Sequence, residues 1–126
     1  MTLSSIDRRI NEGQAFTYTA TLKDSAEVAL AQADITTITL TLYNLADGSI
    51  INSRTAQDVN NVNEVTIHAT SGLLTWSALA ADAVISDDTI EADKTETHVA
   101  LFEFAYGTGL GGTHEFVHYI KKLTNV

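Results

Sequence analysis

Hydrophobic and polar residues alternate with a period of two along several stretches of the chain. The stretches FTYTATL (16–22), TITLTLY (37–43) and EVTIHA (64–69) place apolar side chains, Ala69 included, on one face and threonine, glutamate or histidine on the other. Such alternation is typical of antiparallel strands with one buried face. GLLTW (72–76) adds a short strand that ends at Trp76, and the Asp-Gly in NLADGS (44–49) favours a hairpin leading into IINSRTA.

Two segments depart from this alternation. DSAEVALAQAD (24–34) is rich in alanine and predicts either a short helix or a long hairpin loop, while SALAADAVI (77–85) has helical spacing for about two turns at most. About seven short strands at regular spacing then predict an all-β fold, a two-sheet antiparallel sandwich. We expect one domain over residues 1–126, in which residues 1–14 form an N-terminal arm.

The C-terminal stretch AYGTGLGGTHEFVHYIKKL contains the spacing G-x-G-x-x-G at Gly107, Gly109 and Gly112. A dinucleotide loop of that form needs a following helix, whose N-terminus binds the pyrophosphate. Here THEFVHYI (113–120) follows, and it alternates as a strand. We therefore expect the glycines to supply turn conformations with positive φ, and no nucleotide site.

Four histidines raise the question of a metal site. If 97–106 and 113–123 pair across the glycine turn, we expect His98 and His114 at opposite ends of the hairpin, roughly 26 Å apart. His114 and His118 share a strand face at about 13 Å, and His68 lies on a solvent-facing row. Because ligands must approach one ion to about 2 Å, we expect neither a metal site nor a cofactor on these histidines.

Carboxylates offer two further candidates. Glu103 and Glu115 are expected on the same sheet face as diagonal neighbours, a spacing not far from that of a retaining glycosidase pair, but nothing indicates the concave site that such a pair needs. The acidic run 86–96 could attract calcium through the carboxylates of Asp87, Asp88, Glu91 and Asp93. It lacks the order of a calcium loop, so a solvated loop is favoured, and we expect no enzyme activity.

The last predicted hairpin is apolar on both faces. One face is a core row, in which we align two sets of three, Ala100, Phe102 and Phe104 with Phe116, His118 and Ile120. The opposite face mixes Glu103 and Glu115 with four apolar residues, Val99, Leu101, Val117 and Tyr119. A second apolar face predicts either a central position or cover by a partner, so these four residues are the candidate protein interface.

Composition narrows the partners. The 126 residues include 44% hydrophobic residues, enough for a packed core, and no cysteine for disulfides or a thiolate zinc site. Sixteen acidic against seven basic residues give a net charge of −9, which argues against nucleic acid as a partner. The N-terminal residues carry charges where a signal peptide needs an apolar segment, and no run reaches transmembrane length, so we expect no membrane partner.

Four stretches in order, EGQAFTYTATLKD, TTITLTLYNLADGSII, SGLLTWSALAADAVI and ETHVALFEFAYGTGLGGTHEFVHYIKKL, cover most of the chain. Together they resemble the immunoglobulin-like domains of tailed-bacteriophage structural proteins. The matching pieces are a strand ending in an aromatic at Trp76, the AAD turn at 80–82, and the A-x-F-E-F strand at 100–104. Residues 24–34 and 86–96 are longer than this pattern needs.

The resemblance implies an immunoglobulin-like sandwich without catalytic residues, made in the host cytoplasm and located in the virion. It implies contact with other virion proteins of the capsid or tail, as a symmetric homo-oligomer. Among such roles a capsid surface decoration protein is favoured over a tail, baseplate or head–tail connector module. The alternative is a glycan- or cell-surface-binding module, for which Trp76 exposed beside a loop groove would be the expected sign.

Overall fold

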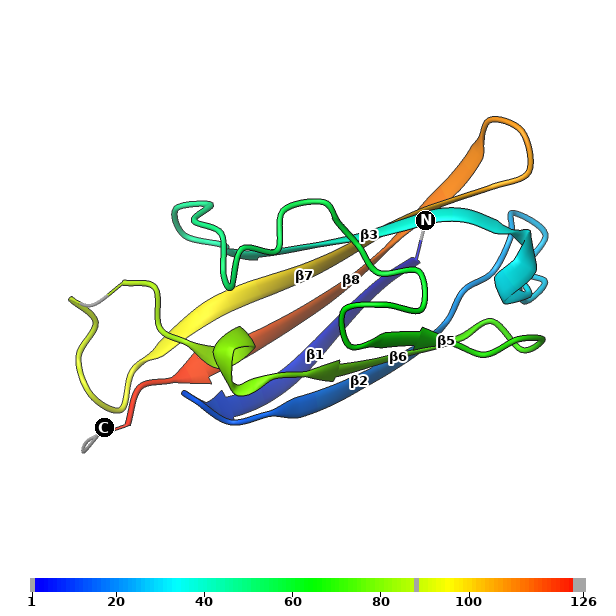
Figure 1. Cartoon of the computed structure of the whole chain (residues 1–126). Helices are drawn as coiled ribbons and strands as arrows, with labels where there is room; N and C mark the ends of the chain where they lie inside the picture. Colours follow the sequence, from blue (N-terminus) through cyan, green and yellow to red (C-terminus); the bar gives the residue numbers. More distant parts are fainter. Residues whose placement is uncertain (1, 88, 124–126) are drawn as a thin grey trace.

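The structure is a computed structural model that describes residues 2–87 and 89–123, with the backbone alone for residues 2–7. Figure 1 shows its elements along the chain. The strands are β1 (Thr2–Asn11), β2 (Phe16–Thr21), β3 (Ile35–Asn44), β4 (Gln57–Asp58), β5 (Val65–Ile67), β6 (Leu73–Ala78), β7 (Thr95–Tyr106) and β8 (Leu110–Lys121). Two short 3-10 turns, η1 (Gln32–Asp34) and η2 (Ala80–Ala83), lie between strands.

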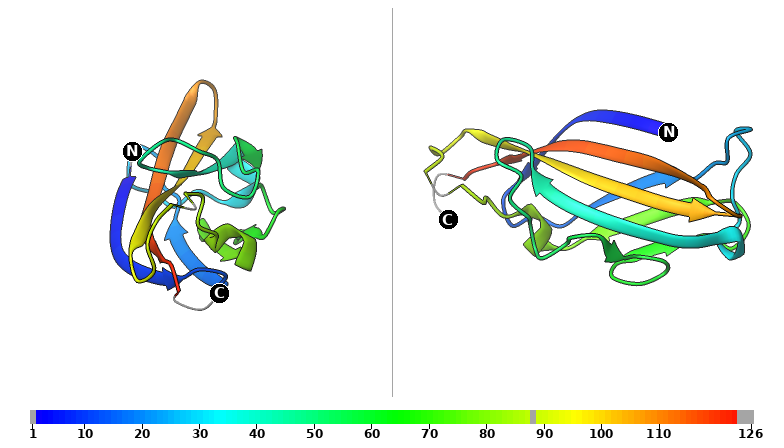
Figure 2. Two further views of the ribbon diagram at one scale, coloured as in Figure 1. Left: turned by 90° about the vertical axis from the view of Figure 1, so that its left-hand side faces the viewer. Right: turned by 90° about the horizontal axis from the view of Figure 1, so that it is seen from above.

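The strands form two sheets that pack face to face (Figures 1 and 2). The larger sheet has the order β1-β8-β7-β3-β4, and the smaller has the order β2-β6-β5. With β2, β5 and β6 as strands B, D and E, and β3, β4, β7 and β8 as C, C′, F and G, this is the strand order of an immunoglobulin-like sandwich. The predicted all-β immunoglobulin-like sandwich is therefore confirmed.

The segment predicted as an N-terminal arm contains an eighth strand. β1 pairs in parallel with β8, with Arg9 opposite Tyr119 and Ile10 opposite Ile120, and the register shifts between Ser5 and Arg9. All other strand pairs are antiparallel, as expected. Ile10 is buried in the core, so β1 belongs to the packed domain. Its residues show little apolar alternation, and the sequence pattern therefore gave no strand here.

The core lies between the sheets and is built from the predicted inward rows. The Tyr18 ring of β2 stacks on Phe116 of β8 at 4.3 Å between centroids, and Trp76 of β6 meets the Phe102 ring edge-on at 5.8 Å. Trp76 is wholly buried, and so lacks the exposure expected for the glycan-binding alternative. Each large apolar side chain buried in this way contributes about 1.5–3 kcal/mol. Ala69, expected on the inner face, is exposed because β5 ends at Ile67.

The two segments that depart from the alternation are mostly loops. Within 24–34 a bridge between Lys23 and Ala29 closes a hairpin loop, and only η1 is helical. Within 77–85 the helical part is the single turn η2. The Asp-Gly turn brings Ser49 back to Asn44, since the Asn44 N–H donates to the Ser49 carbonyl at 2.8 Å. After the bridge between Tyr43 and Ile50 the chain stays beside β3, since the Ile51 N–H donates to the Leu42 carbonyl and the Leu42 N–H donates to the Arg54 carbonyl, both at 2.9 Å. β4 then pairs with β3 at Thr39 and Leu40.

The C-terminal glycines divide into two groups. Gly107 and Gly109 have positive φ in the turn between β7 and β8, as predicted. Gly112 lies inside β8 directly opposite Phe104, so the prediction of a turn conformation is wrong at this residue. A Cβ atom on Gly112 would lie 2.6 Å from the Phe104 ring. This glycine therefore provides space for an aromatic ring on the neighbouring strand.

A buried ion pair joins the loop before β4 to η2. The Arg54 Nε donates to Asp82 Oδ1 at 2.6 Å, its Nη2 donates to Asp82 Oδ2 at 3.0 Å, and both side chains are almost wholly buried. Asp82 also accepts from the Leu79 N–H and from the Asn52 side chain, and Glu64 accepts from Arg54 at the surface. Nothing in the polar sequence around Arg54 indicated this ion pair.

Candidate docking surface

The outer face of the larger sheet presents four long strands to one side of the molecule. The right-hand view of Figure 2 shows β1, β8, β7 and β3 side by side on the face turned to the viewer. On β7 and β8, Ala100, Phe116 and Ile120 are buried on the inner side, and the residues one position away along each strand point to the opposite side. The predicted interface residues Val99, Leu101, Val117 and Tyr119 accordingly lie on the outer face.

Val99 forms the centre of this outer face. It lies directly opposite Val117 on β8 and opposite Tyr43 on β3. Val99 is only 3% exposed, although it faces away from the core, whereas Leu101, Val117 and Tyr119 are half-buried. Tyr43 was not among the predicted interface residues, although it continues the outward threonine row of β3 and could have been found by the same alternation.

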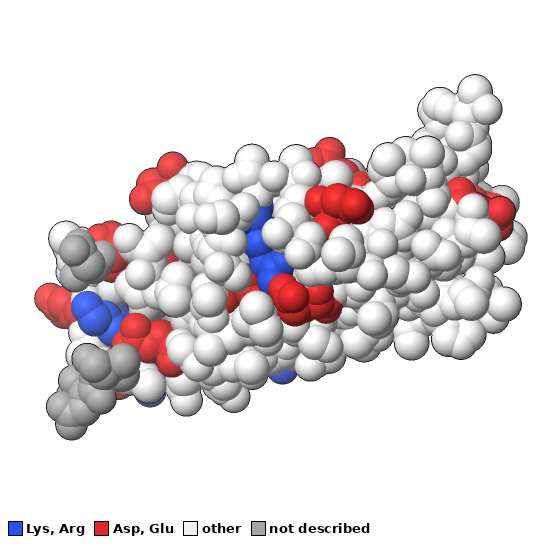
Figure 3. All heavy atoms as spheres, in the orientation of Figure 1, with Lys and Arg blue, Asp and Glu red and all other residues white. Residues whose placement is uncertain are grey.

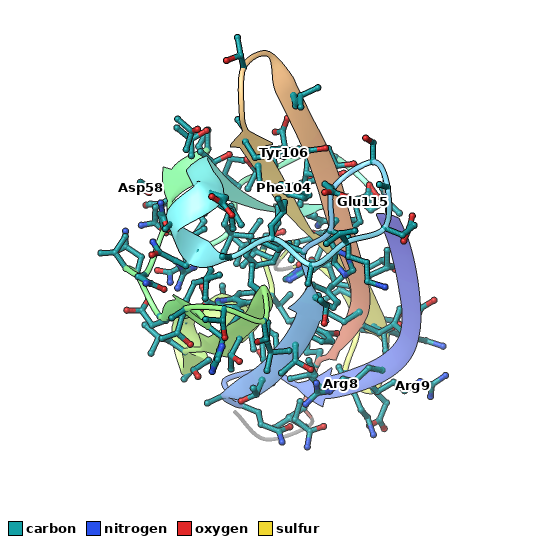
Figure 4. The ribbon with its side chains drawn as sticks, turned by 90° about the vertical axis from the view of Figure 1, so that its right-hand side faces the viewer. Arg8, Arg9, Asp58, Phe104, Tyr106 and Glu115 are labelled. Carbon is teal, nitrogen blue, oxygen red and sulfur yellow. The ribbon has the colours of Figure 1, made fainter. Side chains whose placement is uncertain are left out.

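Charged side chains flank the apolar centre on both sides. Glu103 lies on β7 and Glu115 on β8, diagonal to each other as predicted, with Glu103 opposite Thr113 and Glu115 opposite Leu101. Burial first, and then the negative charge of Glu115, raise the pKa of Tyr43. Arg9 lies opposite Tyr119, and Lys121 opposite Thr95. In Figure 4 Arg9 points away from the sandwich.

A shallow depression of about 570 Å³ lies at the glutamate end of this face. Glu103, Thr37, Thr39 and Thr113 contribute to its walls, and the two glycines at 111 and 112 leave it open. Glu103 is exposed. Glu103 thus lines an open depression and Glu115 lies outside its lining, whereas a glycosidase pair needs both carboxylates in one concave sugar-binding site.

The histidines take a different arrangement from the expected one. β7 and β8 pair so that His98 lies opposite His118, with ring centroids 5.9 Å apart, while His114 lies opposite Phe102. His98 and His114 are thus four residue levels apart, about 13 Å and not the predicted 26 Å. Of the predicted alignments, that of Ala100 with Phe116 is confirmed, whereas those of Phe102 with His118 and of Phe104 with Ile120 are wrong, because residue numbers rise along β7 as they fall along the facing β8. The common core face of these residues is confirmed.

Three of these histidines belong to the core. Burial lowers the pKa of His98 and of His114, and burial together with the charges of His98 and Arg8 lowers the pKa of His118 to about 3. Both ring nitrogens of His118 are buried without a hydrogen-bond partner. His68 is exposed, as predicted. Among residues 2–87 and 89–123, no group of three or more His, Asp or Glu side chains is placed to hold a metal ion.

Glu96 anchors the base of the acidic loop. Its carboxylate accepts from the Ser86 N–H and hydroxyl and from the Asp87 N–H, and its Oε1 lies 2.5 Å from His98 Nε2. Although burial would raise the pKa of Glu96, the bonds from His98, Ser86 and Asp87 lower it below its usual value. Because burial lowers the pKa of His98, the imidazole is neutral at pH 7, and its proton is then on Nε2, where it can be donated to Glu96.

The candidate calcium ligands lie in the loop above this anchor. Asp87 accepts from the Thr89 N–H and hydroxyl, and Asp93 contacts Lys121 at 3.4 Å. Glu91 is exposed, and Asp88 lies outside the described residues. The loop was expected to be solvated along its whole length, but Glu96 at its end is buried. Its role is to tie the loop to β7.

The surface carries a net negative charge. Figure 3 shows more acidic than basic side chains on the face that it presents. The described part of the chain contains no helix that is long and apolar enough to cross a membrane. In comparisons with known proteins, no protein-family model and no curated protein matches this chain.

Proposed function

We propose that this chain is a non-enzymatic docking module whose contact surface is the outer face of the larger sheet. The observation that carries this proposal is the apolar centre of that face, where the half-buried side chains of Leu101, Val117, Tyr119 and Tyr43 lie around the buried Val99. The inner face of the same sheet already packs the core. An antiparallel sheet with one side in water normally carries polar residues on that side, so an apolar outer face favours a partner.

The location of the acid–base candidates supports a role without catalysis. His98, His114 and His118 are buried in the core, where they pack against aromatic rings. Glu103 and Glu115 lie on the open outer face, and Glu96 is engaged in anchoring the acidic loop. Trp76, whose exposure would favour a glycan-binding module, is in the core. We therefore put protein docking ahead of both hydrolysis and glycan binding.

The biological setting that we propose is the virion of a tailed bacteriophage. The support is the resemblance in sequence to immunoglobulin-like domains of phage structural proteins, joined to the immunoglobulin-like strand order. Within that setting we propose an accessory protein on the capsid surface ahead of a tail, baseplate or head–tail connector module. In this role it docks on other virion proteins in several symmetric copies.

The first prediction concerns Leu101→Asp. A charge at the half-buried centre of the outer face should reduce incorporation into particles at least tenfold, because the carboxylate loses its water in the contact. The monomer should stay folded, since the residue faces away from the core. The matched control is Thr19→Asp, which adds the same charge on an exposed position of β2. Equal incorporation of both variants and the unmodified protein would reject the proposed surface.

The measurement is quantitative mass spectrometry of gradient-purified particles, with circular dichroism to check the fold. A copy number that scales with the capsid lattice means a decoration protein. A small number that matches tail or portal symmetry means a tail or connector module. If the chain is absent from particles, the virion setting is wrong and glycan binding becomes the leading hypothesis.

A further inference from the structure

The charges on the outer face are arranged on opposite sides of its centre. Taking the pair Val99 and Val117 as the centre, Glu103 lies four residues away along β7 toward the glycine turn. Lys121 lies four residues away along β8 in the other direction. At about 3.3 Å per residue along a strand, both charged residues lie about 13 Å from the centre. Glu115 and Arg9 repeat this arrangement closer in, two levels to either side.

The charges of two copies of this face are complementary in one relative orientation. Consider a two-fold axis that lies in the plane of the contact and crosses the strands at right angles. Rotation about this axis places residues at a given number of levels on one side of the centre over the residues of the second copy at the same number of levels on the other side. Glu103 of one copy then lies over Thr95 of the second copy, and Lys121 is the neighbour of that Thr95 across the ladder, about 5 Å to the side. That offset is within reach of a lysine side chain. The contact occurs twice, as the symmetry requires.

The inner pair of charges agrees with the same orientation. Glu115 of one copy lies over Tyr119 of the second copy, whose neighbour on β1 is Arg9. A two-fold axis along the strands would instead place each glutamate near the same glutamate of the other copy. Since like charges in contact cost several kcal/mol, the charges select the orientation in which the strands of the two copies run in opposite directions.

The size of the face is sufficient for a dimer. Four strands spaced about 4.8 Å apart and up to twelve residues long give an area on the order of 750 Å². A stable protein interface buries about 800 Å² on each partner. Valine, leucine and tyrosine at the centre, with charges at the rim, match the usual composition of such interfaces.

We propose that two copies of this chain dock face to face through the outer face of the larger sheet, with Glu103 of each copy paired to Lys121 of the other. This inference rests on the proposed docking function and names its partner at this surface. The loops at the two ends of the sandwich then remain for other proteins. Lys121 already contacts Asp93 in its own chain, but this exposed pair contributes little and leaves the ammonium group available.

A charge exchange between the two positions tests the proposal. Glu103→Lys and Lys121→Glu each place like charges together in a homodimer, so each variant alone should dimerise at least tenfold more weakly than the unmodified chain. In a 1:1 mixture of the two variants, lysine at 103 faces glutamate at 121, and lysine at 121 faces glutamate at 103. The mixture should therefore form a heterodimer close to the unmodified dimer in affinity.

The measurement is sedimentation velocity at about 150 mM salt and at protein concentrations up to about 100 µM, with one variant labelled fluorescently. Glu91→Lys and Lys94→Glu are the controls, because they make the same changes of charge in the exposed acidic loop. They should dimerise like the unmodified chain. Circular dichroism confirms that every variant is folded.

Three outcomes would overturn the proposal: an unmodified chain that is monomeric throughout, single variants that dimerise normally, or a mixture that stays monomeric. These results leave the docking function standing if Leu101→Asp still reduces particle incorporation, since the face would then contact another protein. If Leu101→Asp has no effect on particles while the exchange behaves as expected, the dimer holds and the proposed virion role of the face fails.

Discussion

At the scale of single residues, the few polar side chains buried inside the sandwich have a large effect on its stability. Arg54 and Asp82 are both almost wholly buried, so each depends on the other for compensation of its charge. Burial alone would lower the pKa of Arg54, but its bonds to Asp82 and Glu64 raise it above the usual value. Such a pair contributes little compared with an apolar replacement, yet the loss of one partner is costly.

We therefore expect Asp82→Ala to lower the free energy of unfolding by about 3–5 kcal/mol, because it leaves a buried guanidinium without its main partner. It also removes the acceptor for the Leu79 N–H at the start of η2. The measurement is urea unfolding followed by tryptophan fluorescence. Glu64→Gln is the control: Glu64 contacts the same Arg54 from a side chain that is 36% exposed, and its loss should cost less than about 1 kcal/mol. Equal losses in both variants would contradict this account.

At the scale of elements, the long β7–β8 hairpin depends on a size match across the ladder. Phe104 and Gly112 face each other, and the aromatic ring occupies the place of the missing side chain. Phe104 remains buried in this position. The strand therefore contains a glycine for packing reasons, at a position with no positive φ.

This match leads to a prediction for Gly112→Ala. The added methyl group collides with the Phe104 ring, and we expect a loss of about 1–3 kcal/mol in unfolding free energy, as for other overpacked sites. Combining it with Phe104→Leu should cost less than the sum of the two single changes, because the smaller side chain makes room. A double-mutant cycle measured by urea unfolding gives the coupling. Strict additivity would show that the two positions do not share this space.

The elements themselves were largely predictable from the sequence, and their irregular parts were not. β2, β3 and the second half of the last hairpin follow from strict alternation, which depends only on one buried face per strand. β1 was missed, because its sequence shows little apolar alternation and its place is set by pairing with the edge of β8. The helical spacing in 77–85 predicted up to about two turns of helix, but only a single turn forms, since Asp82 fixes this turn through its tertiary contact with Arg54.

The candidate surface was predictable in part for the same reason. Alternation places Val99, Leu101, Val117 and Tyr119 on one face regardless of register. The level of each residue needs the register, and the histidine alignment was wrong for that reason. The burial of Glu96 could not be foreseen from an acidic run, because it depends on backbone N–H groups of Ser86 and Asp87 that only the folded loop brings close.

At the scale of the whole molecule, the buried histidines should determine the response to acid. The pKa of His118 is about 3 in the folded protein because of burial, against about 6.5 when unfolded. Below pH 6.5 the unfolded chain binds a proton that the folded chain does not, so stability is complete above pH 6.5 and falls as the pH drops toward 3. The rate is about 1.4 kcal/mol per pH unit for one histidine, or about 5 kcal/mol over this window.

Burial lowers the pKa of His98 and His114 as well, and the pKa of Glu96 is below its usual value, so all four groups oppose folding in acid. Around His118 the charged groups are His98 on β7, Arg8 on β1 and Asp82 in η2; the first two lower its pKa and Asp82 raises it. We expect His118→Phe, which keeps an aromatic ring against Phe16 and Tyr18, to reduce the slope of stability against pH between 6.5 and 3.

Urea unfolding at a series of pH values measures that slope, and NMR of the His118 ring gives an independent reading. In the folded protein the ring signal should not titrate between pH 7 and 5. A ring that titrates near pH 6.5, or an unchanged slope in the variant, would contradict the burial of a neutral imidazole.

The parallel pairing of β1 with β8 also bears on how the molecule resists a mechanical load. Because the first and last strands run side by side in the same direction, the chain enters at one end of the sandwich and leaves at the other (Figure 1). A force that pulls the two ends apart acts along the strands and loads the β1–β8 hydrogen bonds in shear. They must then yield together, whereas a perpendicular force would break them one at a time. The fold is therefore suited to remain closed under tension between two attachment points.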